Sequence, residues 1–350
     1  MIDILSLSQD EIKDLLKTID ASGSANYRSP QIYRWLHKSQ VLSFDEMTNL
    51  PAQLRETLKK HFFIMSIDVE EKLVSKKKDT EKYLYRLNDG NTIETVFMKH
   101  DYGNSLCISS QVGCKMGCTF CASGLAGFVR NLAPSEMLLQ VYETERLGKT
   151  IDSIVVMGVG EPLDNFDNVV TFLRTLKSTD GREMSLRRVS ISTCGLTDKI
   201  HELVKLKLGV TLSVSLHAVT DEERSAIMPI NKKHNLAELL ESCRAFWALS
   251  KRRISFEYAL INGINDSAAH ATKLAELLKR AKIQPASCHV NLIPINEVDE
   301  THYKKSANAN DFLKTLEKAG INATIRRTMG EDINAACGQL RIKKGIAKQT

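Results

Sequence analysis

Residues 111–124, QVGCKMGCTFCASG, hold three cysteines in the spacing C-x3-C-x2-C: Cys114, Cys118 and Cys121. Three thiolates can bind three irons of a cubic iron–sulfur cluster and leave the fourth iron open to a small molecule. A structural zinc site usually has four ligands in two pairs, and no second pair follows here. The glycines and polar residues around the thiols argue against three core cysteines that are close only by chance. We therefore expect an open [4Fe–4S] cluster, whose free iron can take the amino and carboxylate groups of S-adenosylmethionine.

Beyond this loop, strand-like and helical patterns alternate from residue 104 onward. The expected strands are 105–110, 153–158, 188–193, 210–217, 254–261 and 289–294. The expected helices lie near 134–147, 165–177, 196–207, 235–250, 267–281 and 309–319. Six such units predict an α/β fold with a parallel sheet and right-handed crossovers, either closed into a barrel or partly open.

Polar residues follow the carboxyl ends of these strands. They are the turn GVGEP at 158–162, Ser192 and Thr193, Ser215 and His217, and Asn296. In a (β/α) barrel this rim forms the active site, and Glu161 would accept a hydrogen bond from the methionine amino group. Each residue has a simpler structural explanation: glycines for a tight turn, Ser192 as a helix cap, His217 as a buried histidine. Their convergence on one rim favours a binding site.

The first 103 residues differ in pattern from the rest. Residues 1–65 form a small helical accessory domain by our prediction, with helices after Ser8, from Ser29 and Pro30, and from Pro51. Residues 66–103 contain two strand-like runs, KYLYRL and TIETVFMK. Asn88, Asp89 and Gly90 lie between these runs and predict a hairpin turn.

The composition is that of an ordinary globular protein: 350 residues, 43% hydrophobic and 26% charged, with a net charge of +6. We found no apolar run of the ~18 residues that a membrane span needs, and no signal peptide, so we expect a cytoplasmic protein with reduced thiols. Cys194, Cys243 and Cys288 fit buried, small hydrophobic positions. Basic clusters, more often solvated faces than RNA grooves, occur at Lys76–Lys78, Lys251–Arg253 and in the tail with Arg341, Lys343, Lys344 and Lys348.

The segment GEDINAACGQL at 330–340 places Cys337 among alanines and glycines, which suits an accessible thiol on a flexible loop. Together with GVGEP, SLHA, MPIN and NLIP, this segment and the cysteine motif resemble the RlmN/Cfr family of radical S-adenosylmethionine RNA methyltransferases. The resemblance extends over nearly the full length from about residue 27. Two positions depart from the family pattern, Val159 and the run VTDEER at 219–224.

The resemblance implies a partial, TIM-like (β/α)6 radical SAM barrel over 104–345, with the hairpin extension of 66–103 carrying Glu94. It implies a [4Fe–4S] cluster on the three cysteines. It also implies two S-adenosylmethionine molecules per turnover, held by Gly160, Glu161, Ser192, Ser215, Leu216, His217 and Asn296. Cys337 corresponds to the methylated cysteine, and Cys107 to the thiol that pairs with it in a disulfide. Glu94 corresponds to the proton acceptor; without the resemblance, we would interpret Glu94 as an ordinary carboxylate at a strand edge.

By the same resemblance, the substrates are an adenosine of the peptidyl transferase centre in 23S rRNA and the adenosine next to the anticodon in tRNA, each methylated at carbon 2. An electron donor such as flavodoxin or ferredoxin, no membrane partner and a monomeric state are also expected. A Cfr-type enzyme would methylate carbon 8 of the same rRNA adenosine with the same residues and confer antibiotic resistance. A non-enzymatic RNA-binding protein with a closed zinc site is the alternative from another class.

Overall fold

A computed structural model describes all residues of the chain except 21, 126, 284, 297–300 and 341–350. One ten-stranded sheet dominates it, in the order β14-β13-β12-β11-β10-β9-β6-β5-β4-β3. Its strands are β3 (Asp68–Val74), β4 (Thr80–Arg86), β5 (Thr92–His100), β6 (Gly103–Ile108), β9 (Ser153–Val156), β10 (Val189–Thr193), β11 (Thr211–Ser215), β12 (Ile254–Leu260), β13 (Cys288–Pro294) and β14 (Ala323–Ile325).

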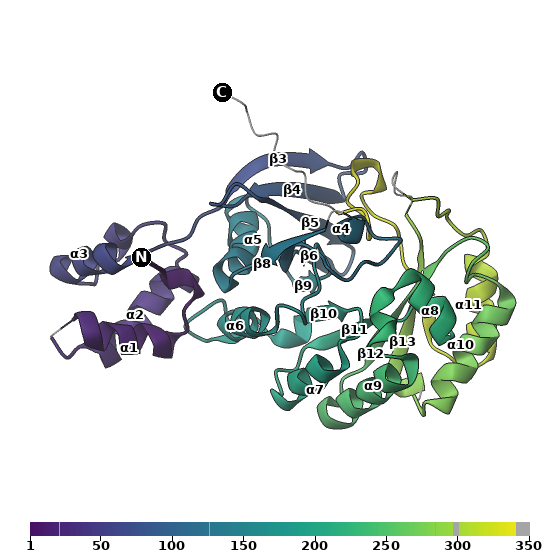
Figure 1. Cartoon of the computed structure of the whole chain (residues 1–350). Coiled ribbons are helices and arrows are strands. Elements are labelled where there is room, and N and C mark those ends of the chain that lie inside the picture. The colour runs from purple at the N-terminus through teal and green to yellow at the C-terminus, as the bar shows by residue number, and fades with distance from the viewer. Residues whose placement is uncertain (21, 126, 284, 297–300, 341–350) are drawn as a thin grey trace.

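Strand direction divides this sheet into two parts. From β6 to β14 all neighbouring strands are parallel, whereas from β3 to β6 each strand is antiparallel to its neighbour. The parallel part contains the six predicted strands, and β14 adds a seventh that the sequence patterns did not reveal. The parallel strands curve into a partial barrel, and the hairpin strands extend its sheet (Figure 1).

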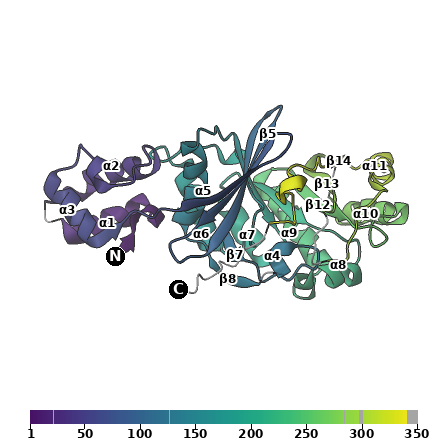
Figure 2. The ribbon, with the colours of Figure 1, turned by 90° about the horizontal axis from the view of Figure 1, so that it is seen from above.

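Helices cover the outer face of the barrel, and the N-terminal helices lie beyond it at the end opposite α10 and α11 (Figure 2). The helices are α1 (Gln9–Ile19), α2 (Ala25–His37), α3 (Ala52–His61), α4 (Ala122–Leu125), α5 (Pro134–Arg146), α6 (Phe166–Lys177), α7 (Thr197–Lys205), α8 (Asp221–Ile227), α9 (Leu236–Ser250), α10 (Ala268–Arg280) and α11 (Ala309–Lys318). None of the described helices is long and apolar enough to cross a membrane.

The N-terminal helices follow their sequence signals with one correction. Ser8 and Glu11 form a capping box at the start of α1. Helix α2 begins at Ala25, so Pro30 lies inside it and does not open it as predicted. Two short strands, β1 (Ile2–Asp3) and β2 (Phe62–Phe63), pair in parallel and bring the two ends of this region together.

The two faces of the barrel strands differ in chemistry, and this difference creates the site. Residues that point outward, such as Ile191, Leu212 and Phe256, are buried under the helices. Residues that alternate with them point inward and line a cavity; they include Ser190, Thr211, Ser213, Ser255, Glu257 and Asn291. Because side chains alternate along a strand, one sequence pattern supplies both an apolar core and a polar interior.

Candidate active site

The cysteine loop lies between two short antiparallel strands, β7 (Gln111–Gly113) and β8 (Phe128–Asn131). At its start, the Cys114 amide donates a hydrogen bond to the carbonyl oxygen of Gly127 at 2.9 Å. Helix α4 begins directly after Cys121. The loop is therefore closed at its base by a small ribbon, which holds the three thiols within a short stretch of chain.

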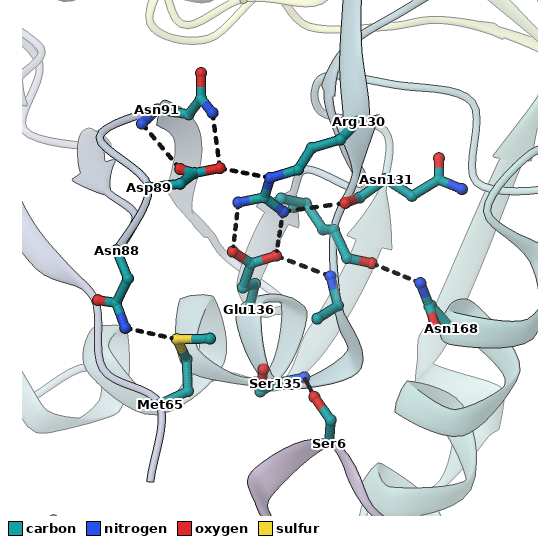
Figure 3. Close-up of polar contacts among 12 residues, drawn as sticks. Ser6, Met65, Asn88, Asp89, Asn91, Arg130, Asn131, Ser135, Glu136 and Asn168 are labelled. Carbon is teal, nitrogen blue, oxygen red and sulfur yellow. Dashed lines mark hydrogen bonds and ion pairs between the residues drawn. The ribbon is translucent and has the colours of Figure 1, made fainter. Parts of the chain in front are cut away.

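Arg130 on β8 anchors this ribbon to the rest of the molecule (Figure 3). Its guanidinium donates two hydrogen bonds to Glu136 at the start of α5, at 2.7 and 2.8 Å. Its Nε atom donates to Asp89 in the hairpin turn at 2.6 Å. Burial alone would raise the pKa of Asp89, but the hydrogen bonds from Arg130 and Asn91 and the charge of Arg130 together outweigh burial and lower that pKa to about 2. The hairpin, the ribbon and α5 are thus joined by one charged network.

The three cysteines line a cavity of about 140 Å³ that also contains the predicted rim residues. Among those residues are Gly158, Gly160, Glu161, Ser192, Ser215 and His217. Burial raises the pKa of Cys114 to about 12, so this thiol must lose its proton to become an iron ligand. In the described part of the chain, no three His, Cys, Asp or Glu side chains meet closely enough to hold a single metal ion. Three thiols that share one cavity with a glycine-containing turn suit a cluster with a ligand on its open iron.

The GVGEP turn packs directly against β7. A side chain at Gly160 would come within 2.5 Å of the Gln111 Cβ atom, and its φ of 107° also requires glycine. The Gln111 side chain accepts a hydrogen bond from the Glu161 amide at 2.8 Å. The Glu161 carboxylate accepts from the amides of Leu163 and Cys194 at 3.0 and 2.7 Å, and burial raises its pKa. The tight-turn explanation is therefore correct for Gly160, and this turn also forms a wall of the cysteine cavity.

The other predicted rim residues are not equivalent. Ser192 does not cap a helix, because the cap residue of α7 is Leu196. His217 has a left-handed φ of 58°, and its Nδ1 atom accepts a hydrogen bond from the Ala259 amide at 2.9 Å. Burial lowers the His217 pKa to about 3, so the ring is neutral. Leu216 is fully buried in the main core, which leaves only its backbone for a ligand contact.

Asn296 lies on the other side of the site, in a larger cavity. Its side-chain amide donates to the Cys337 carbonyl at 3.0 Å. Its side-chain oxygen is buried, and no hydrogen-bond partner for it is found among the described residues. Buried polar atoms are usually satisfied, so this oxygen fits a contact with a bound polar ligand such as S-adenosylmethionine.

The larger cavity has a volume of about 600 Å³ and contains both remaining predicted thiols, Cys107 and Cys337. Met157 lines this cavity and also the cysteine cavity, so the two spaces share a wall. Cys107 is buried on β6 and Cys337 is half-buried, and both are free thiols here, so the disulfide that the resemblance implies between them is not formed in this structure. Burial, and then the neighbouring Cys337, raise the pKa of Cys107 to about 12.

The segment around Cys337 is held firmly, in contrast to the expected loose loop. The Gly338 carbonyl accepts from the Ala122 amide at 2.8 Å, and the Leu340 carbonyl accepts from the Ser123 hydroxyl at 2.7 Å. These contacts connect the segment to α4, next to the cysteine loop. Ala335 and Leu340 also pack against Cys107. Small residues surround Cys337 because the segment fits closely between other elements.

Glu94 is the one predicted catalytic residue that does not line either cavity. It is buried on β5, and its carboxylate accepts a hydrogen bond from Lys82 at 2.9 Å. Val96 and Met98 lie on the same face of that strand and do line the larger cavity. The Glu94 side chain therefore lies just beyond the cavity wall.

Sequence reasoning missed four residues at this site. Cys194, predicted only as a core residue, is buried but also lines the cysteine cavity. Met157 and Arg326 line the larger cavity, and Lys82 pairs with Glu94. Only Cys194 and Met157 could have been found from the sequence, because they lie at the carboxyl ends of predicted strands.

A cysteine-bearing loop after the first strand of a partial (β/α) barrel, with polar groups on the same rim, defines a radical S-adenosylmethionine enzyme. Residues 108–275 match the radical SAM superfamily, and residues 2–64 match the ribosomal RNA large subunit methyltransferase N-terminal domain. A solved radical SAM methyltransferase from Sphaerobacter thermophilus superposes with a TM-score of 0.89 at 37% identity, covering 97% of this chain and 99% of that chain.

Curated relatives show which family of radical SAM enzymes the chain resembles. A "Probable dual-specificity RNA methyltransferase RlmN" of Lachnoclostridium phytofermentans is 49% identical over 343 residues, 97% of this chain and 94% of that protein. A protein of the same name from Alkaliphilus oremlandii is 48% identical over 345 residues, 98% of each chain. The chain belongs to the RlmN family of radical SAM RNA methyltransferases. The alternative of a non-enzymatic zinc protein is therefore set aside.

Proposed function

We propose that the chain methylates carbon 2 of an adenosine in the peptidyl transferase centre of 23S rRNA and of the adenosine next to the anticodon in tRNA. The observation that supports this function is the presence of Cys107 and Cys337 in one cavity that shares Met157 with the cysteine cavity. The curated relatives, named as dual-specificity RNA methyltransferases, support the choice of two RNA substrates.

Cys337 would act as the methyl carrier. Carbon 2 of adenine has no lone pair, so it cannot displace a sulfonium methyl group, whereas a thiolate can. The methyl carbon would then join the ring while still bound to the Cys337 sulfur. Attack of the Cys107 thiolate on that sulfur would form an S–S bond and break the C–S bond. The electron pair of the broken bond would pass to the methylene carbon, which takes up a proton and becomes the methyl group of the released RNA. A cellular thiol reductant would reopen the disulfide.

The three cysteines of the loop would hold a [4Fe–4S] cluster beside S-adenosylmethionine. When bound, this pair supplies the one-electron chemistry that activates the methyl group on Cys337. The residues proposed to bind S-adenosylmethionine are Gly160, Glu161, Ser192, Ser215, Leu216, His217 and Asn296. An electron-donating protein such as flavodoxin or ferredoxin would serve the cluster, and we propose that the enzyme works as a cytoplasmic monomer.

Glu94 would accept the proton that leaves carbon 2. Its position on the same face of β5 as Val96, which lines the cavity, supports this role. The target base would be splayed out of its stack into the larger cavity, because a stacked base cannot reach Cys337. Phosphate contacts from nearby basic residues would hold the RNA without reading its sequence.

The test is mass spectrometry on unmodified rRNA and tRNA fragments that carry deuterium at carbon 2 or carbon 8 of adenine. They are incubated with anaerobically reconstituted enzyme, S-adenosylmethionine and a reductant. Both labelled fragments should gain a methyl group. Only the fragment labelled at carbon 2 should lose its deuterium. Loss of deuterium only from carbon 8 would assign the Cfr-type reaction instead, and Cys337→Ala protein serves as the inactive control.

A further inference from the structure

Lys82 is a buried lysine that joins two parts of the active site. Its ammonium donates to the Glu94 carboxylate at 2.9 Å and to the Asn334 carbonyl at 3.0 Å. The side chains of Lys82 and Glu94 are only 7% and 2% exposed. Asn334 lies three residues before Cys337, so one ammonium group contacts both the proposed base and the segment of the proposed methyl carrier.

The position of Lys82 in the sheet explains why it can reach both. Lys82 on β4 is the register partner of Val96 on β5, and Val96 is in turn the partner of Cys107 on β6. Partners in neighbouring strands point to the same face. Lys82 therefore lies in one row with Val96, which lines the larger cavity, and with Cys107.

Residues 330–340, which we name the Cys337 segment, approach β4 closely at this point. A side chain at Gly330 would come within 2.7 Å of the Thr80 side chain. The Asp332 carboxylate accepts from the Lys76 amide at 2.8 Å. Within the segment, the Ala335 amide donates to the Gly330 carbonyl at 2.8 Å. Lys82 supplies the one side-chain ammonium found among the described contacts between the segment and the hairpin strands.

A buried ammonium group that donates hydrogen bonds to two acceptors makes a strong and directional contact. Without it, the Asn334 carbonyl would lose its donor and the Glu94 carboxylate would lose its counter-ion. The Glu94 carboxylate lies away from water, so solvent does not readily compensate the loss of this partner. Asn334 is an exposed residue, and its bond to Lys82 is only partly buried, so that loss is the smaller of the two. The Cys337 segment and Glu94 would then no longer be held in a fixed position relative to each other.

We infer that Lys82 is a positioning residue that seats the Cys337 segment on the hairpin and fixes Glu94 beside it. The inference rests on the proposed function, in which Cys337 carries the methyl group and Glu94 accepts the ring proton. Among the described contacts, Lys82 bonds the proposed base and the Asn334 carbonyl and neither of the two thiols. Its contribution is the alignment of two groups that come from distant parts of the chain.

The first measurement is hydrogen–deuterium exchange of the Cys337 segment in the holoenzyme without RNA. In Lys82→Met protein, the amides of 333–339 should exchange about tenfold faster than in the unchanged protein, because the segment opens more often. The control is Lys72→Met, which removes a lysine on neighbouring β3 that pairs with Glu81 at 2.9 Å. Unchanged exchange in Lys82→Met protein would overturn the inference, as would equal acceleration by the control.

The second measurement is steady-state methylation. Misaligned groups slow the chemical step, so kcat of Lys82→Met protein should fall at least about tenfold while KM for RNA stays within about twofold. A rise in KM with unchanged kcat would contradict a positioning role. If the unchanged enzyme fails to methylate carbon 2, the proposed function fails, but the exchange result still reports on Lys82.

A double variant guards against a folding defect. Lys82→Met combined with Glu94→Gln leaves no unpaired buried charge, and Glu94→Gln alone is its control. The double variant should be as stable to heat as the control, yet still show the faster exchange of the Cys337 segment. Slow exchange in the double variant would mean that Lys82 does not seat the segment.

Discussion

The two thiols of the larger cavity have different surroundings although they lie together. Cys107 is buried, and its pKa of about 12 keeps it protonated at neutral pH. Cys337 is half-buried and shares the cavity with the guanidinium of Arg326, whose pKa is raised by the Cys337 thiolate. Cys337 is the more accessible of the two thiols and lies in one cavity with a cationic side chain, so it is the better first nucleophile. Cys107 is better suited to a later step.

This difference predicts distinct products from two single variants. Cys337→Ala protein should yield neither methylated RNA nor methylated protein, because no sulfur is placed to take the methyl group. Cys107→Ala protein should methylate Cys337, attack the base and then stall with RNA attached. A denaturing gel should show a protein–RNA band for Cys107→Ala only. A band from the Cys337 variant, or full turnover by either one, would refute the assigned roles.

The residues that could be predicted from the sequence carry a local signal. Three cysteines in close spacing, two glycines before a glutamate and a cysteine between alanines and a glycine are unusual in themselves. Lys82 and Arg326 are not: a lysine opening a strand-like run and an arginine after a short strand have no local mark. Their importance comes from the strands that lie beside them, which only the fold supplies.

At the scale of elements, helix α2 joins the N-terminal helices to the barrel through two buried contacts. The Tyr33 hydroxyl donates to Thr175 on α6 at 3.0 Å, and the His37 Nδ1 atom lies 3.1 Å from the Tyr142 hydroxyl on α5. His37 is fully buried, and its Nε2 atom has no hydrogen-bond partner among the described residues. Burial lowers the pKa of His37 to about 3.

This contact should weaken in mild acid. The unfolded chain binds a proton at His37 near the ordinary pKa of 6.5, whereas the folded chain does so only near 3. Folding stability is therefore complete above pH 6.5 and falls as the pH drops from 6.5 towards 3. Between pH 7.5 and 5.5, the unchanged protein should lose about 1.4 kcal/mol more than His37→Gln protein. Denaturant unfolding at both pH values measures this, and equal losses would show that His37 is not buried as a neutral ring.

The elements themselves were predicted unevenly, for physical reasons. Long runs with alternating or helical periodicity gave six barrel strands and most helices near their observed positions. Strands β7 and β14 have three residues each and β8 has four, so their periodicity is too brief to detect. Strand β3, DVEEKLV, is rich in charge because it lies at the sheet edge. Pro30 misled the prediction, since proline usually marks the first turn of a helix.

At the scale of the whole molecule, the basic clusters lie on different sides of the barrel. Lys76–Lys78 form the turn between β3 and β4, where the Lys76 amide contacts Asp332 of the Cys337 segment. Lys251–Arg253 precede β12, at the amino ends of the parallel strands, and so lie on the rim away from the site. The basic tail lies outside the described residues. The first cluster thus contacts the Cys337 segment, whereas Arg252 of the second donates to the Thr211 hydroxyl at the amino end of β11.

RNA binding should therefore depend on one cluster and not on the other. Replacing Lys76, Lys77 and Lys78 by alanine should weaken RNA binding and flatten its salt dependence by about 0.7 per lost phosphate contact. The matched control replaces Lys251, Arg252 and Arg253, and each set contains one residue with left-handed backbone, Lys78 or Lys251. Filter binding across a salt series measures both slopes. Equal slopes for the two variants would contradict this placement of the RNA.

The ten-stranded sheet has another consequence, because it ends at β14 and β3 and does not close on itself. An open edge is a template for fibre growth between copies of a chain. Here β14 offers only three residues, and β3 carries a register shift between Val69 and Glu71. The charges of β3 are paired inward, with Glu70 bound to Arg86 and Lys72 to Glu81. The hairpin that carries Glu94 thus also shields an aggregation-prone border, and variants that neutralise β3 should precipitate before they lose activity.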